Sequence, residues 1–298
     1  MEFLSKMLEE QYGIEIAKKI IEGYTKQRKT TFRVNTLKSS IIEIEEKLKQ
    51  TNIEYDRIPW YEEAIIVKNA DKKTIQELDM YKNGEIYLQS LSSMLPPIIL
   101  VPKERADILD MAAAPGGKTT QMAALSKNKA HITACEKNKI RAERLKYNID
   151  KQGATSVFVM TKDARYIDDF FSFDQILLDA PCSGSGTLVI NDNEIKNEFT
   201  KELVERSMSA QLNLLKKAIK ILKPGSEMVY STCSVLACEN EDIIQNVLST
   251  GKVEVVPIDF AGIENIPVLP TKIDGTLCVC PNELYEGFFV AKLRKNKI

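Results

Sequence analysis

Two cysteines stand where a nucleophile and a second, assisting thiol could act on one substrate. Cys182 lies in the segment Asp-Ala-Pro-Cys-Ser-Gly-Ser-Gly, directly after the apolar run 173–178. Cys233 lies in Tyr-Ser-Thr-Cys-Ser, directly after the strand-like segment 225–229. If the two strands are parallel neighbours, both thiols open into the crevice at the carboxyl edge of the sheet, where open α/β sheets bind their ligands. The pair therefore indicates covalent chemistry on a bound substrate.

A glycine-rich loop at residues 110–119 indicates a second part of this site. It reads Asp-Met-Ala-Ala-Ala-Pro-Gly-Gly-Lys-Thr, follows a predicted strand and opens a predicted helix. Small residues let the backbone approach a ligand closely, and a helix N-terminus favours an anionic group. From Ala112 to Thr119 the loop also resembles a phosphate-binding P-loop ending in Gly-Lys-Thr, and the run 175–179 could serve as its magnesium-binding strand.

Several features favour a nucleoside-type ligand over a triphosphate. Ala112 occupies the position of the first P-loop glycine, and Pro115 lacks the backbone N–H that a phosphate cradle would use. Glu136 ends the second predicted strand about 20 residues after the loop, where an acid suits the two hydroxyls of a ribose. Asp163, after the third strand, could accept from an adenine amino group. S-adenosylmethionine fits this pattern, and a plain tight turn with solvated acids is the alternative.

The rest of the pattern predicts the elements that position these residues. The order β-α-β-β-α-β in the first part is the split βαβ arrangement, which also underlies one RNA-binding fold. From about residue 89 strands and helices alternate, which predicts a doubly wound, mostly parallel α/β sheet. We expect an N-terminal helix with an RRM-like region at 1–88 and the doubly wound domain at 89–298. The predicted strands are 31–36, 53–58, 64–67, 85–88, 107–111, 131–135, 156–160, 174–178, 227–231, 253–256 and 287–292, and the predicted helices include 1–28, 40–50, 74–79 and 201–222.

Composition narrows the class of protein. The 298 residues carry a formal net charge of -1, so any RNA site must be a local basic patch. The six cysteines show no Cys-x-x-Cys spacing and His131 is the only histidine, so we expect neither a metal site nor a Cys-His protease. The first residues, Met-Glu-Phe-Leu-Ser-Lys, do not have the pattern expected of a signal peptide, and prolines interrupt the longest apolar stretch, 94–101. We therefore expect no membrane span, a cytoplasmic location with reduced thiols, and a monomer.

Together these motifs resemble the Sun-type (NSUN) RNA cytosine-C5 methyltransferases. The similarity rests on Ala-Ala-Pro-Gly-Gly-Lys-Thr in the loop, on the two cysteine segments, and on Glu239-Asn240-Glu241 after the second of them. The segment Phe-Arg-Val-Asn-Thr-Leu at 32–37 resembles the N-terminal signature of the family, and Glu-Gly-Phe-Phe-Val-Ala-Lys at 286–292 resembles its last strand.

This resemblance implies a class I methyltransferase fold with S-adenosylmethionine as cofactor. It implies that Cys233 is the nucleophile, that Cys182 assists release of the product, and that Asp179 stands between the cofactor and the target base. A thiolate that adds to C6 of cytosine makes C5 nucleophilic enough to take a methyl group. Asp179 could stabilise charge at N3 of the ring. The residues placed at the cofactor are Ala112, Ala113, Ala114, Pro115, Gly116, Gly117, Lys118, Glu136, Arg141, Asp163 and Asp179.

The expected partner is tRNA or rRNA, and its target base must leave the stack to reach the crevice. A basic cluster near the first N-terminal strand could hold phosphates, and an ordinary solvated surface is the alternative. The candidate RNA contacts are Lys26, Arg28, Lys29, Arg33 and Asn35. The chain departs from the family at Ser90, where members often have Asp, and at Cys278 and Asn282, where they often have Arg and His. These departures concern positions that could touch RNA or support the site.

Two other functions stay open on the sequence. A P-loop nucleotide hydrolase would need the 110–119 loop to bind a triphosphate. A non-catalytic RNA-binding assembly factor with a vestigial cofactor site would require none of Cys182, Cys233 and Asp179. The presence of all three favours the RNA methyltransferase, and the sequence does not distinguish tRNA from rRNA.

Overall fold

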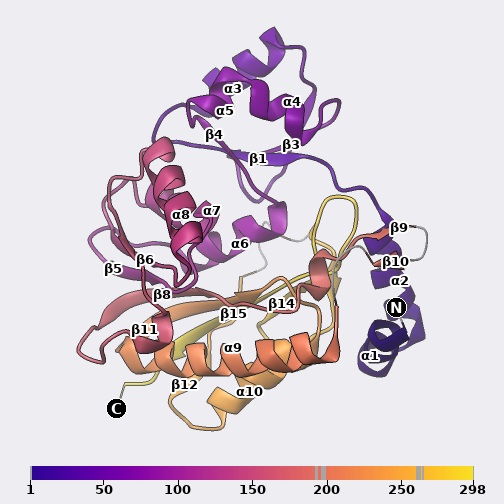
Figure 1. The fold of residues 1–298 in the computed structure, drawn as a ribbon, viewed down its shortest axis with the longest axis vertical. Helices are drawn as coiled ribbons and strands as arrows, with labels where there is room; N and C mark the ends of the chain where they lie inside the picture. Colours follow the sequence, from indigo (N-terminus) through magenta and orange to yellow (C-terminus); the bar gives the residue numbers. More distant parts are fainter. Residues whose placement is uncertain (1, 192–193, 196–198, 260–262, 264, 298) are drawn as a thin grey trace.

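The computed structural model describes residues 2–191, 194–195, 199–259, 263 and 265–297. The two larger of three sheets organise these residues, a small N-terminal sheet and a large one that carries both cysteine segments (Figure 1). The prediction of a doubly wound domain with a small N-terminal split βαβ region is confirmed. The boundary at residues 88 and 89 stays a prediction.

The small sheet is antiparallel, with strand order β2-β3-β1-β4. Alternate residues of β1 point to opposite faces, and Phe32 and Val34 pack with the helices in one core. The helix α3 begins as the sequence predicts, because the Ser40 hydroxyl accepts from the Glu43 N–H and the Glu43 carboxylate accepts from the Ser40 N–H. The elements are β1 (Thr31–Val34), α3 (Ile41–Gln50), β2 (Tyr55–Arg57), β3 (Ala64–Val67), α4 (Lys72–Glu77), α5 (Asp79–Lys82) and β4 (Ile86–Leu88).

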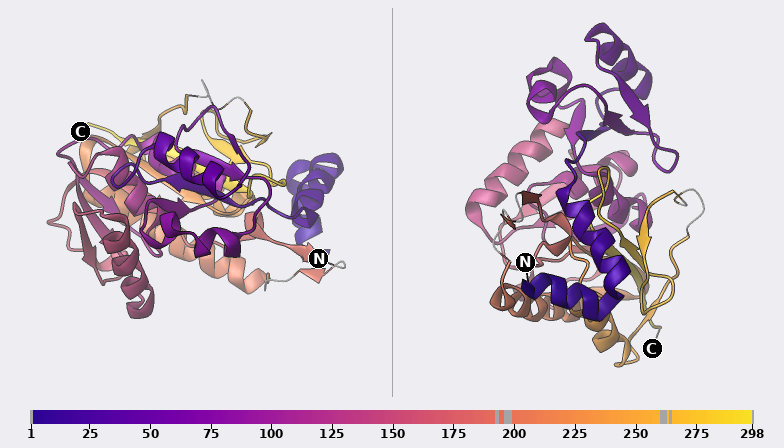
Figure 2. Two further views of the ribbon diagram at one scale, coloured as in Figure 1. Left: turned by 90° about the horizontal axis from the view of Figure 1, so that it is seen from above. Right: turned by 90° about the vertical axis from the view of Figure 1, so that its right-hand side faces the viewer.

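The N-terminal helical segment differs from the prediction of one helix over 1–28. It forms α1 (Glu2–Tyr12) and α2 (Ile14–Thr25), which are separated by Gly13 at φ +79°. Leu8 and Ile20 are fully buried in the core of the large domain, and both helices lie beside that domain, away from the small sheet (Figures 1 and 2). The residues before β1 therefore belong to the packing of the large domain.

Five parallel strands form the centre of the large sheet, in the order β11-β8-β5-β6-β7. The chain adds β6 and β7 on one side of β5 and then returns to add β8 on the other side. This reversal creates the switch point at which such sheets bind ligands. The strands are β5 (Asp107–Asp110), β6 (His131–Cys135), β7 (Val157–Met160), β8 (Phe173–Asp179), β11 (Leu222–Thr232), β12 (Val253–Val255), β13 (Val268–Leu269), β14 (Leu277–Val279) and β15 (Phe288–Lys295).

Helices cover both faces of this sheet, so its strands are apolar on both sides. In β8, Ile176 and Leu178 join one core and Leu177 joins the other. The first core includes side chains of the long helix α9, and the second includes α6 and α7, as the two layers in Figure 1 show. The helices are α6 (Leu91–Leu100), α7 (Gly117–Leu125), α8 (Lys139–Gln152), α9 (Lys201–Ile221) and α10 (Glu241–Leu248), with 3-10 turns η1 (Ala164–Tyr166), η2 (Ser185–Thr187) and η3 (Ala237–Glu239).

The helix α6 contains two prolines that sequence reasoning treats as an interruption. Pro97 has no N–H to donate to the carbonyl of Ser93. The side-chain amide of Gln89 donates to that carbonyl instead, at 3.0 Å. A side chain therefore replaces the missing backbone donor and the apolar segment stays helical. No helix within the described ranges is long and apolar enough to cross a membrane.

Short strands are the elements that the sequence pattern misses. The prediction has no counterpart of β13, β14 or the hairpin of β9 (Ile190–Asn191) and β10 (Glu194–Ile195). Runs of two or three residues are too short for a period of two to be visible. Pairing with β15, which runs antiparallel to β11, creates β14.

Candidate active site

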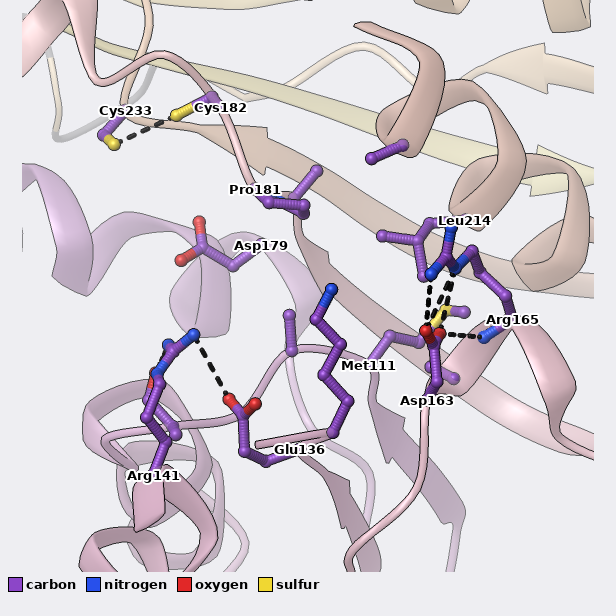
Figure 3. Close-up of a pocket in the computed structure, with 16 residues that line it drawn as sticks. Met111, Glu136, Arg141, Asp163, Arg165, Asp179, Pro181, Cys182, Leu214 and Cys233 are labelled. Atoms are coloured by element: carbon purple, nitrogen blue, oxygen red, sulfur yellow. Dashed lines mark hydrogen bonds and ion pairs between the residues drawn. The ribbon is translucent and has the colours of Figure 1, made fainter. Parts of the chain in front are cut away.

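The two cysteines lie together at the carboxyl edge of neighbouring parallel strands. Asp179 at the end of β8 is paired in register with Ser231 of β11, so the loops that follow both strands start side by side. The two sulfur atoms of Cys182 and Cys233 are 3.1 Å apart (Figure 3). The prediction that the two strands are neighbours and that both thiols open into one crevice is confirmed.

The environment of Cys182 holds its proton. Its hydrogen bond with Cys233, its burial and the nearby charges of Cys233 and Glu239 raise the pKa of the Cys182 thiol well above its usual range. Two thiolates this close would repel one another strongly. At neutral pH Cys182 is therefore protonated.

Asp179 is paired with a buried ammonium group. Its Oδ2 accepts from Lys118 Nζ at 2.7 Å, and its Oδ1 accepts from Ser231 Oγ at 2.7 Å. Lys118 Nζ also donates to Ser93 Oγ at 2.8 Å. Burial lowers the pKa of Lys118, but the charge and hydrogen bond of Asp179 outweigh it and raise this pKa overall. Lys118 therefore carries a positive charge beside Asp179 and Cys233.

Two adjoining cavities meet at these residues. The first, of about 290 Å³, extends from the cysteines past Ala112 to the ends of β6 and β7. The second, of about 300 Å³, lies between the same loop and the residues around β4 and α6. Both cavities are lined by Ala112, Ala114, Asp179 and Cys233. The nucleophile candidate and the carboxylate therefore form a common wall, accessible from both sides.

Acids line the far end of the first cavity. Glu136 is only 4% exposed; its Oε1 accepts from the Asn138 N–H at 2.8 Å, and its Oε2 lies 3.4 Å from Arg141 Nη1. Arg141 also donates to the Ala114 carbonyl at 2.8 Å, which ties α8 to the loop. The Arg165 guanidinium grips Asp163 and lowers the pKa of that carboxyl, so Asp163 is an ionised acceptor. Figure 3 shows both acids on the side of the cavity away from the cysteines.

The two carboxylates of the first cavity fit a cationic nucleoside and not a triphosphate. Two carboxylates would repel phosphates, whereas they can accept from ribose hydroxyls and from an adenine amino group. Ala112 and Ala114 leave the cavity open next to the loop. Lys118, the lysine that a P-loop would direct at phosphates, is engaged by Asp179 and Ser93. The cavity therefore suits S-adenosylmethionine, and the P-loop hydrolase is not supported.

The rest of the loop is shaped by buried polar contacts. Asp110 ends β5, is 1% exposed and accepts from Thr119 Oγ1 at 2.6 Å. Burial raises the pKa of Asp110 to about 6. Gly116 adopts φ +109°, a conformation that side-chain-bearing residues rarely adopt. Of the loop residues expected at the cofactor, Ala113, Pro115 and Gly117 line the second cavity and not the first.

The structure corrects two of the expected RNA contacts. Arg33 and Asn35 are both 0% exposed, so neither offers a surface to phosphates. Both point inward because the small sheet packs on α7 and α8: Arg33 donates to Thr120 Oγ1, and Asn35 donates to the Gln152 carbonyl. Lys26 and Lys29 are exposed. Arg28 is half-buried and donates to the Gly186 carbonyl in the loop that follows Cys182, at 3.4 Å.

The positions that depart from the family pattern differ in their contacts. Ser90 lines the second cavity and donates to Glu286 Oε2 at 2.7 Å. Cys278 is buried, with its sulfur 3.8 Å from the Tyr12 hydroxyl. Asn282 Oδ1 accepts from two backbone N–H groups of its own turn. Of the three, Ser90 is the one whose side chain lies at the site.

Glu239 is part of the family motif Glu239-Asn240-Glu241, but the sequence predicts no role for its side chain. Its side chain is 0% exposed, and its carboxylate accepts from Ser183 beside Cys182 and from Ser234 beside Cys233. An acid six residues after a candidate nucleophile was the available signal, but nothing in the sequence shows that it turns back toward both loops.

Comparison with known proteins gives the family. Residues 97–294 match the family described as 16S rRNA methyltransferase RsmB/F, and residues 2–72 match its ferredoxin-like domain. The ribosomal RNA small subunit methyltransferase F of Shewanella loihica is 35% identical over 91% of this chain, which spans 57% of the length of that relative. The tRNA (cytosine(49)-C(5))-methyltransferase of Pyrococcus abyssi is 34% identical over 94% of this chain and 97% of its own length.

A solved structure agrees with this assignment. NSun6 from Pyrococcus horikoshii with SFG, an S-adenosylmethionine analogue, superposes with a TM-score of 0.86 at 26% identity and covers 99% of this chain and 98% of its own. The fold and the two-cysteine site thus define a class I methyltransferase. The chain belongs to the RsmB/F family of RNA methyltransferases, and its predicted resemblance to the Sun-type enzymes is confirmed. Among the described residues, no group of three or more His, Cys, Asp and Glu side chains could hold a metal ion.

Proposed function

We propose that this protein methylates C5 of a cytosine in ribosomal or transfer RNA, with S-adenosylmethionine as the methyl donor. The observation that carries the proposal is the thiol pair, whose sulfur atoms are 3.1 Å apart; both cysteines line the first cavity, and Cys233 also lines the second. Names of relatives support both RNA classes, since they include a ribosomal RNA methyltransferase and a tRNA cytosine-C5 methyltransferase. We propose a cytoplasmic location for this reaction.

The first cavity is the proposed cofactor site. Glu136 would accept from the ribose hydroxyls, and Asp163 would accept from the adenine amino group, because each carboxylate lies at the end of its strand. Arg141 would keep Glu136 and the loop in place through its bonds to both. When bound there, S-adenosylmethionine would supply the electrophilic methyl group for the reaction.

The second cavity is the proposed site of the flipped base. Cys233, as thiolate, forms a bond to C6, and the electrons of the C5–C6 double bond move toward C5 and N3. The Lys118 ammonium lies where it can stabilise this negative charge, and Asp179 holds it there at 2.7 Å. Preorganised charges of this kind are usually the largest single contribution to catalysis.

Cys182 is the proposed group for product release. After methylation, the C5 proton must leave, its electron pair must restore the C5–C6 double bond, and the C6–S bond must break to return the Cys233 thiolate. Cys182 would first have to give its own proton to solvent, and its raised pKa then makes the resulting thiolate a strong base for the C5 proton. The 3.1 Å contact places Cys182 directly beside the bond that breaks.

The test is transfer of labelled methyl from S-adenosylmethionine to separated tRNA and rRNA from cells that lack this gene, followed by nucleoside analysis. The expected product is 5-methylcytidine in one RNA fraction, which would also name the substrate class. Cys233→Ala should abolish the transfer while binding of S-adenosylmethionine persists. A methylated nucleoside other than 5-methylcytidine, or full activity without Cys233, would overturn the proposal.

A further inference from the structure

A fully buried carboxylate joins the two cysteine loops. Glu239, at the end of η3, is 0% exposed and accepts on both oxygens. Its Oε1 accepts from the Ser183 backbone N–H at 2.7 Å, and its Oε2 accepts from the hydroxyls of Ser183 and Ser234, both at 2.6 Å. Ser183 follows Cys182 in the chain, and Ser234 follows Cys233. One side chain is therefore hydrogen-bonded to the residue that follows each cysteine.

The residues before the two cysteines are held by the same group of side chains. Gln211 of α9 donates to the Pro181 carbonyl at 2.9 Å and lies 3.4 Å from Glu239 Oε1. Asn240, next to Glu239, accepts from the Thr232 hydroxyl and donates to the Ser234 carbonyl at 2.9 Å. The residues on both sides of each cysteine are therefore held by hydrogen bonds with Glu239, Asn240 or Gln211. We call these three side chains the clamp; no hydrogen bond from them to either cysteine side chain is present among the described contacts.

Fold stability alone does not account for an acid at this position. Burial of a carboxylate is costly, and well-packed apolar side chains are often at least as stabilising. The three bonds from the two serines instead fix the distance between loops that belong to different strands. A shift of about 1 Å in such a pair can lower a rate on the order of 100-fold.

We propose that Glu239 is a positioning residue, which clamps the loops after β8 and β11 so that the thiols of Cys182 and Cys233 stay in contact through addition and release. The proposal rests on the proposed function for its kinetic consequence, and on the observed contacts for its geometric one. It assigns Glu239 no contact with RNA or cofactor.

The test compares Glu239→Ala with Glu239→Gln. Glutamine can keep the clamp, because its oxygen can accept from the Ser183 N–H and its amide can donate to both serine hydroxyls. Alanine removes every hydrogen bond of the Glu239 carboxylate and leaves the backbone bonds of this residue in place. Glu241→Gln is the matched control, since Glu241 is another buried acid, 3% exposed, for which no contact with either loop is present among the described hydrogen bonds.

The first readout is the rate at which diamide oxidises Cys182 and Cys233 to an intramolecular disulfide, measured by mass spectrometry of the peptides. It needs no RNA, so it tests the clamp even if methyl transfer to RNA is never observed. We expect the rate of disulfide formation to fall roughly tenfold or more in Glu239→Ala, because a disulfide requires Cα and Cβ positions in a narrow range. In Glu239→Gln and in the control Glu241→Gln we expect the wild-type rate.

The second readout is steady-state methylation. In Glu239→Ala we expect kcat to fall on the order of 100-fold, while KM for S-adenosylmethionine stays within about twofold of the wild-type value. In Glu239→Gln we expect kcat within about tenfold of the wild-type value. If Glu239→Ala does not fold, Ser183→Ala, which loses the hydroxyl bond and keeps the backbone bond, should show a smaller loss of the same kind. Unchanged disulfide formation and unchanged kcat in folded Glu239→Ala or Ser183→Ala would overturn the proposal.

Discussion

Replacement of Arg33 by methionine tests whether this basic residue supports the fold or binds RNA. The Arg33 guanidinium donates to Gln89 Oε1 at 3.1 Å, to Thr120 Oγ1 at 2.6 Å and to the Gly117 carbonyl at 3.3 Å. It also lies over the ring of Tyr87, 5.2 Å from the centroid. The bonds to Thr120 and Gly117 connect β1 of the small sheet to α7, the helix that follows the cofactor loop, and the bond to Gln89 reaches the segment between β4 and α6. Arg33→Met keeps the apolar stem and removes all of them.

The size of the effect follows from these bonds. Each hydrogen bond from a charged donor stabilises a protein by roughly 1.5–3 kcal/mol. Removal of the guanidinium also relieves the cost of its burial, which lowers the pKa of Arg33 and offsets several kcal/mol. We expect the free energy of unfolding to fall by about 3 kcal/mol, which corresponds to a midpoint lower by about 1 M urea.

Urea titration followed by circular dichroism measures the stability, and RNA binding at several salt concentrations measures the phosphate contacts. For Arg33→Met we expect the loss of stability with an unchanged salt slope. The double variant Lys26→Ala with Lys29→Ala is the control, in which RNA binding and not stability should change. Because these lysines are exposed, the free energy of unfolding should change by less than about 0.5 kcal/mol, while the salt slope of RNA binding should fall by about one for each lost phosphate contact. Arg33→Met with wild-type stability and a reduced slope would refute the burial argument.

Three further predictions concern the site. Cys182→Ala should accumulate a covalent protein–RNA adduct that survives denaturing electrophoresis, because release and not addition is impaired; clean release would contradict the role of Cys182. Glu136→Gln should weaken S-adenosylmethionine binding roughly 10- to 100-fold by calorimetry, the effect of one lost charge-assisted hydrogen bond, and an unchanged Kd would place the ribose elsewhere. Burial raises the pKa of Asp110 from 3.8 to about 6, so its native carboxyl binds a proton more tightly than the unfolded chain does, and its contribution to stability is lost as the pH rises through 6. Relative to wild type, Asp110→Asn should therefore gain about 3 kcal/mol in unfolding free energy between about pH 4 and pH 7, and parallel urea titrations that show a constant difference would exclude this burial effect.

Short stretches of the sequence were enough to predict the class of fold and the main site residues. The helix predicted over 40–50 depends on local signals, since the capping box of Ser40 and Glu43 that starts α3 joins residues only three apart in the chain. A cysteine directly after each of two apolar runs predicts a thiol at the carboxyl edge of a sheet, because parallel strands end at the same edge. Glu136 and Asp163 follow the strands β6 and β7 and are placed at the same edge of the sheet. These inferences need only the spacing of residues along one element.

Contacts between distant segments were decided by the tertiary structure alone. Arg33 and Lys29 are both basic residues of one short segment, yet Arg33 is buried because β1 is covered on both faces. Glu239 is one acid among many until η3 turns it toward both cysteine loops. Ser90 meets Glu286 across 196 residues of chain.

The physical reason is the range of the information that each inference uses. Helix caps, turns and alternation depend on neighbours in the chain, so their chemistry is visible in the sequence. Burial, the 3.1 Å sulfur–sulfur contact and the clamp at Glu239 depend on which strands become neighbours and which helices cover them. The sequence by itself therefore determined the residues available for chemistry. Strand pairing in the large sheet, and the helices and small sheet that pack against it, decided which of these residues meet.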